Sequence, residues 1–61
     1  MPVVEVKMWK GRTAEQKAAI IKGITEVFEK QGTPKEWTTV IITDFEKSDW
    51  GVKGEPATKI K

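Results

Sequence analysis

Pro2 is the residue whose position gives it the clearest chemical potential. An initiator methionine is normally removed when the second residue is small, and removal of Met1 would leave Pro2 with a free secondary amine. An ordinary α-amino group titrates at about 7.7–8.0, and burial beside apolar side chains lowers that pKa further. A base whose pKa lies near the operating pH is suited to proton transfer. Position alone, however, favours the commoner role, in which the proline aids processing and begins a strand.

The other residue types narrow the chemistry mainly by exclusion. The chain has no cysteine and no histidine, which excludes disulfides, thiolate or imidazole metal ligands and histidine acid–base catalysis. Ser48 is the lone serine and has no histidine to activate it, and the sequence contains no phosphate-binding loop or metal cluster. Asp44 and Glu46 could form a carboxylate pair, but such positions near a strand end are more often simply exposed.

The length of 61 residues predicts a single domain, residues 1–61. A domain of this size buries only roughly 60% of the surface that its unfolded chain exposes. Small chains usually compensate with disulfides, a metal or self-association. Because thiolate and imidazole groups are missing, association with other chains is the expected route, unless packing alone suffices.

Charge and hydropathy indicate which partners to expect. The net charge is +2, from 11 basic and 9 acidic residues, and the lysines alternate with glutamates along the chain. Nucleic-acid binding would require a clustered basic face with aromatic platforms, so no nucleic-acid partner is predicted. No apolar run reaches the length of a membrane span and no signal peptide precedes the first strand, so we expect a cytoplasmic protein without a membrane partner.

Two strands and a helix are predicted from the hydrophobic pattern. Residues 2–9 alternate apolar and polar side chains and are typical of a half-buried strand. The run of β-branched residues at 38–43 predicts a second strand, buried on both faces. The turn residues around Trp50 and Val52, within 48–54, predict a short C-terminal hairpin.

The helix is predicted from Thr13 to about Gln31. Thr13 with Gln16 forms a capping-box pattern, and Gly32 followed by Pro34 forms a helix-end pattern. An apolar stripe runs along the expected helix and comprises Ile20, Ile21, Ile24, Val27 and Phe28. The predicted fold class is therefore α/β, a right-handed βαβ protomer with parallel strands and a C-terminal hairpin. One sheet face and two edges stay bare, so we expect oligomerisation to complete the sheets.

The chain resembles the 4-oxalocrotonate tautomerase family over essentially its whole length. The similarity depends on the order and spacing of several short pieces rather than on any one of them. These pieces are Pro2, Lys10-Gly11-Arg12-Thr13, Glu15-Gln16-Lys17, Val40-Ile41-Ile42-Thr43, Trp50-Gly51-Val52 and Gly54-Glu55.

This resemblance implies an isomerase in which Pro2 shuttles a proton within a small enol or 2-hydroxydienoate acid to give the conjugated ketone, as in aromatic degradation. Arg12, the only arginine, would bind a substrate carboxylate through two parallel hydrogen bonds. Trp50 would wall the pocket, with Trp9 and Phe45 as further lining, although core or interface packing is the commoner fate of such residues. The resemblance also implies that no cofactor is needed and that three dimers form a hexamer whose sites lie between subunits.

Thr39 marks a departure from the family pattern. Family members active on the dicarboxylate carry a second arginine at this position, where it stabilises charge on a substrate oxygen. Loss of such a donor can cost roughly 2.7–4 kcal/mol. Three explanations are open: Lys35 or another lysine substitutes, the natural substrate lacks the second carboxylate, or the activity is weak.

Three other functional hypotheses are also open. A hydratase or dehalogenase-like relative would use a protonated proline as an acid toward water addition, and it would require a group that activates water. A catalytically silent subunit of a mixed hexamer would fit the absence of the second arginine at Thr39. A bare binding module is the simplest hypothesis, and the combination of Pro2 with Arg12 argues against it.

Overall fold

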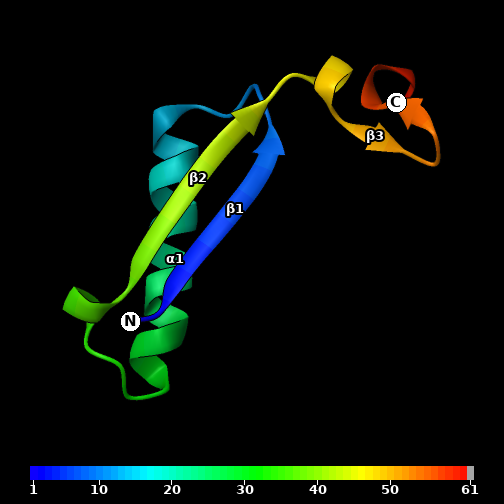
Figure 1. Cartoon of the computed structure of the whole chain (residues 1–61). Helices are drawn as coiled ribbons and strands as arrows, with labels where there is room; N and C mark the ends of the chain where they lie inside the picture. The colour runs from blue at the N-terminus through cyan, green and yellow to red at the C-terminus, as the bar shows by residue number, and fades with distance from the viewer. Residues whose placement is uncertain (61) are drawn as a thin grey trace.

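A parallel pair of strands lies at the centre of the chain (Figure 1). In the computed structural model, which describes residues 1–60, strand β1 is Val3–Trp9 and strand β2 is Thr39–Phe45. The register pairs the two strands residue for residue along their whole length, so both start and both end at the same place. The predicted parallel βαβ unit is confirmed.

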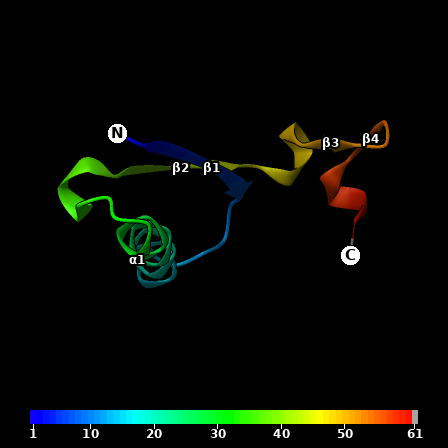
Figure 2. The same cartoon turned by 90° about the horizontal axis from the view of Figure 1, so that it is seen from below.

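Helix α1, Ala14–Lys30, lies across one face of this strand pair (Figure 2). Its start is fixed by the predicted capping box. The backbone N–H of Gln16 donates to the Thr13 hydroxyl oxygen at 3.1 Å, and the Thr13 N–H donates to Gln16 Oε1 at 2.9 Å. Two N–H groups that a helix start leaves without partners are thus satisfied reciprocally.

The end of α1 is set by Gly32, which has a φ of 95°. Glycine reaches this conformation without the steric cost that a Cβ would bring. The N–H of Gly32 donates to the Glu29 carbonyl and that of Thr33 to the Phe28 carbonyl, both at 3.0 Å. These two bonds form a Schellman motif, which ends the helix one residue before the predicted limit at Gln31.

The interior is formed by the facing sides of α1 and the strand pair. Half-buried apolar side chains from both layers meet there: Val4, Val6, Met8, Ile20, Ile24, Phe28, Val40 and Ile42. Two members of the predicted helix stripe do not join them, because Ile21 is 40% exposed and Val27 58% exposed. The stripe is therefore wider than the surface that one strand pair can cover.

The opposite face of the strand pair has no covering layer in the single chain. Val3 and Ile41 point to this face and are 47% and 45% exposed. The prediction that β2 is buried on both faces is thus wrong for one copy of the chain. The physical reason is that α1 is one layer and can cover one face only.

The C-terminal residues form a small unit beyond the ends of β1 and β2, away from α1 (Figure 1). Strands β3, Gly51–Val52, and β4, Glu55–Pro56, pair antiparallel and confirm the predicted hairpin. Lys53 and Gly54 form the two-residue turn with φ angles of 54° and 78°, as a type I′ turn requires.

Ala57, just after β4, is completely buried, and its N–H donates to the Trp50 carbonyl at 2.7 Å. This bond closes the hairpin unit back onto the residue that precedes β3. Within residues 1–60, no helix is long and apolar enough to cross a membrane.

Candidate active site

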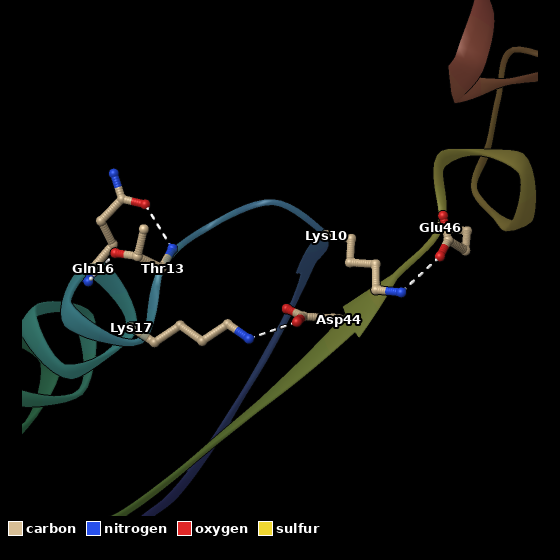
Figure 3. A network of polar contacts seen from close by, with 6 residues as sticks. All are labelled: Lys10, Thr13, Gln16, Lys17, Asp44 and Glu46. Carbon is tan, nitrogen blue, oxygen red and sulfur yellow. Dashed lines mark hydrogen bonds and ion pairs between the residues drawn. The ribbon is translucent and has the colours of Figure 1, made fainter.

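The loop that carries Arg12 is fixed at its β1 end by contacts to the end of β2. The Lys10 N–H donates to the Phe45 carbonyl at 2.9 Å, and Lys10 Nζ pairs with Glu46 Oε1 at 2.9 Å (Figure 3). The hydrogen bond that Lys10 Nζ donates to the Glu46 carboxylate, and the negative charge of that carboxylate, raise the pKa of Lys10 above its ordinary value of 10.5. Both side chains are exposed, so the ion pair adds little stability but orients the loop.

The other end of the loop is fixed by the start of α1. Lys17 Nζ lies 2.5 Å from Asp44 Oδ2 (Figure 3). The Lys17 side chain is 30% exposed and that of Asp44 27%. Together with the capping box, this ion pair holds the first turn of the helix against β2. Arg12 therefore lies between Lys10 and Lys17, whose side chains both pair with residues at the end of β2 or just after it, within 44–46.

Asp44 and Glu46 do not form the carboxylate pair that the sequence allowed. Asp44 turns toward α1 and pairs with Lys17, whereas Glu46 pairs with Lys10 (Figure 3). Glu46 is exposed, as expected for such a position, but Asp44 is partly buried. Among residues 1–60, acidic side chains do not gather in groups of three that could hold a metal ion.

Three aromatic residues predicted for the site pack together where β1 and β2 end. The ring centroids of Trp9 and Trp50 are 6.1 Å apart and those of Phe45 and Trp50 are 6.0 Å apart, both in edge-on geometry. Such T-shaped pairs place a positive ring edge against a negative ring face. Lys47 Nζ lies 4.9 Å from the Trp9 ring centroid, within the range of a cation–π contact.

A pocket of about 380 Å³ lies beside this aromatic cluster. Its volume is within the range usual for small-molecule sites. Arg12 is on its wall, as predicted, and none of the lining residues is acidic. The lining comprises Trp9, Lys10, Gly11, Arg12, Gln16 and Lys47.

Pro2 lies at the opposite end of the strand pair. It is half-buried just before β1, and its carbonyl accepts a hydrogen bond from the Thr39 N–H at 3.0 Å. A strand rises about 3.3 Å per residue, so the seven residues of β1 place Pro2 on the order of 20 Å from the pocket. The predicted site residues thus divide in a single chain: Pro2 and exposed Thr39 lie at one end, and Arg12 with the aromatic cluster at the other.

Sequence reasoning missed three polar residues of the pocket, namely Lys10, Gln16 and Lys47. Lys10 and Gln16 flank Arg12, and the family-like segment 10–17 could have indicated them. Lys47 follows Phe45 by two residues, but nothing in a lysine-rich sequence separates it from the other lysines. Its place over Trp9 is visible only in three dimensions.

Comparison with known families identifies the chain. The profile of the family described as tautomerase enzyme matches residues 2–60. A 2-hydroxymuconate tautomerase of Pseudomonas sp. (strain CF600) is 36% identical over 62 aligned positions, which cover 100% of this chain and 98% of the relative. The chain belongs to the 4-oxalocrotonate tautomerase family.

Solved structures of tautomerases share this fold. The crystal structure of apo unfused 4-OT superposes with a TM-score of 0.91 at 34% identity, covering 98% of this chain and 100% of that one. A 4-oxalocrotonate tautomerase isozyme from Methylibium petroleiphilum gives a TM-score of 0.86 at 40% identity, covering 93% and 94%. The chain is thus a tautomerase-like isomerase, and its βαβ unit and hairpin are those of the family.

Proposed function

We propose that this tautomerase converts small enol or 2-hydroxydienoate acids to their conjugated ketones. Pro2, freed by removal of Met1, takes the hydroxyl proton of the substrate and returns it to a carbon further along the conjugated system. Arg12 holds a substrate carboxylate and Trp9 forms part of the pocket wall. Trp50, packed edge-on against both Trp9 and Phe45, supports that wall from beside the pocket. The reaction moves one proton within one molecule and consumes no redox equivalent, so it requires no redox cofactor.

The chemistry of the pocket around Arg12 is the main support for this function. A lining with cations and without acidic side chains favours an anionic ligand, and a guanidinium matches a carboxylate bidentately. The family match begins at Pro2, which includes the proposed base. The relative from Pseudomonas sp. (strain CF600) is named for 2-hydroxymuconate, an acid of the proposed substrate class.

We further propose that each site forms between copies of the chain. Pro2 and Arg12 of one chain lie on the order of 20 Å apart, too far to act on one small substrate. The bare sheet face with Val3 and Ile41 offers apolar surface for a neighbouring copy. A homohexamer built as three dimers would cover this face and bring Pro2 of one copy to Arg12 of another.

An ultraviolet assay with phenylenolpyruvate or 2-hydroxymuconate tests the function. Intact mass first confirms that Met1 is absent, and turnover above the buffer rate is then expected. The matched variant carries one lysine inserted between Met1 and Pro2, because a bulky second residue retains methionine and leaves the Pro2 nitrogen as an amide. Wild-type turnover by this variant, with unchanged oligomer mass, would contradict the role of Pro2.

Thr39 favours one alternative, a weak or silent subunit of a mixed hexamer. Its side chain lies exposed at the Pro2 end, where the family's second arginine would stand. Native mass spectrometry with and without a companion chain distinguishes this alternative from a homohexamer. A hydratase is less favoured, because Asp44 and Glu46, the carboxylates next to the pocket-bearing loop, are both paired with lysines.

A further inference from the structure

We propose that Lys47 is a second substrate-binding cation, and that Arg12 and Lys47 together hold a single carboxylate beside Trp9. This inference rests on the proposed function and narrows its substrate class. The ligand is a planar conjugated acid, whose carboxylate lies between the two cations and whose conjugated part covers the indole ring.

The charges around the pocket are the first support for this inference. Three cations line it, namely Lys10, Arg12 and Lys47. Glu46 neutralises Lys10 through the ion pair at 2.9 Å. Within residues 1–60, Arg12 and Lys47 have no ion-pair partner, so two positive charges share one pocket without compensation. An anion between them would relieve their mutual repulsion.

The placement of the two cations is the second support. Arg12 comes from the loop between β1 and α1, whereas Lys47 comes from the connection between β2 and β3. The first loop is held by the end of β2, and the second connection is held by the packing of Trp50 on Phe45 at 6.0 Å. A carboxylate offers about four lone-pair sites on its two oxygens, so it can accept two hydrogen bonds from Arg12 and a further one from Lys47 on a separate segment.

The contact between Lys47 and Trp9 is the third support. The ammonium lies 4.9 Å from the centroid of the indole ring, and Trp50 packs edge-on against the same ring. A cation–π contact at a pocket rim is weak, so a carboxylate competes with it for the ammonium. When Lys47 turns toward the carboxylate, the Trp9 face becomes free to stack on the conjugated chain of the substrate.

The test measures binding of cinnamate and of its neutral analogue cinnamamide to the assembled protein by titration calorimetry. Lys47→Gln should raise the Kd for cinnamate about five- to tenfold, because Lys47 is exposed and water weakens the charge-assisted hydrogen bond that the substitution removes. Arg12→Gln should raise it by at least as much. Lys22→Gln makes the same charge change on the exposed surface of α1 and should leave the Kd unchanged. Cinnamamide should bind all four proteins equally.

Each alternative outcome has a distinct meaning. If Arg12→Gln weakens cinnamate binding but Lys47→Gln does not, the role of Lys47 is wrong and the proposed function stands. If neither substitution matters, the pocket is not a carboxylate site and the proposed function loses its substrate-binding residue. If Lys47→Gln weakens cinnamamide equally, Lys47 only supports the Trp9 wall. Lys47→Arg keeps the charge and should bind cinnamate within about twofold of wild type, because a guanidinium also pairs with carboxylate.

Discussion

The two ends of the strand pair differ in how far one chain builds them. At the Arg12 end, two ion pairs, a capping box and an aromatic cluster fix a pocket within a single chain. At the Pro2 end, one backbone hydrogen bond from Thr39 fixes the proline, and Trp37 nearby on the chain before β2 is 61% exposed. One chain thus builds the pocket around Arg12 completely, whereas the Pro2 end stays open in the single chain, as a site shared between copies would require.

The largest effect on activity is expected when one variant lacks a working Pro2 end, a second variant lacks a working Arg12 end, and the two are mixed. The lysine-insertion variant with a blocked Pro2 and the Arg12→Gln variant should each lose most activity. When the two are refolded together at equal amounts, about a quarter of wild-type activity should return, because random assembly gives one site in four both intact parts. The measurement is the turnover rate of the mixture against each variant alone. A mixture as inactive as its components would show that the two ends do not meet between copies.

Removing the ion pair beside the pocket tests how firmly the Arg12 end is built. Asp44→Asn leaves Lys17 partly buried without its partner and should lower the free energy of unfolding by about 1–2 kcal/mol. Urea denaturation at fixed protein concentration measures this loss. Glu55→Gln is the control, since the Lys59–Glu55 pair at 3.2 Å is exposed and should contribute less than about 0.5 kcal/mol. Equal losses in both variants would mean that burial of the Asp44 pair has no effect.

The capping box tests the helix side of the same loop. Thr13→Ala removes the hydroxyl that accepts the Gln16 N–H and should cost about 1 kcal/mol. Thr25→Ala is the matched control. The Thr25 hydroxyl donates to the Ile21 carbonyl inside the helix, where such a bond does not satisfy an unpaired helix-end group and adds no stability. Helix content by circular dichroism during thermal unfolding reports both. A Thr13→Ala midpoint equal to that of wild type would contradict the capping role.

The smallest expected effect concerns the Lys10–Glu46 pair. Because the folded-state pKa of Lys10 is raised, its contribution to stability is complete below the unfolded pKa and is lost as the pH rises through the folded value. The NMR titration of the Lys10 side chain should move back toward 10.5 in Glu46→Gln. High salt should have the same direction of effect, since both side chains are exposed. An unchanged titration would show that Glu46 does not hold the loop in solution.

Local signals in the sequence predicted the local structure well. The helix limits at Thr13 and Gly32 are set by hydrogen bonds and backbone angles within a few residues, and the structure has them within one residue. The exposed face of β2 could not be predicted in the same way, because β-branched residues favour burial without naming the layer that buries them. The single chain offers no second layer for that face, where Val3 and Ile41 stay exposed.

The candidate site was predictable only in part for a related reason. The family-like segments indicated Arg12 and the aromatic residues, which the structure brings to one end, with Arg12, Trp9 and Lys47 lining the pocket. Lys47 was missed, because its distinction is a position over Trp9 rather than a pattern along the chain. Pro2 was indicated by its place in the sequence, but its separation from Arg12 follows from the length and parallel direction of β1 and β2.

The loop that carries Arg12, between β1 and α1, is held on both sides by contacts to Asp44, Phe45 and Glu46. These fixed contacts limit where related chains can change in length. An insertion between Lys10 and Thr13 would break the match between loop length and these fixed attachment points and would displace the guanidinium. The connection at 32–35 follows the other end of α1 and makes no hydrogen bond or ion pair with these three residues. Insertions and deletions in related chains should therefore occur mainly in that connection, because a change of its length does not displace Arg12 from the pocket.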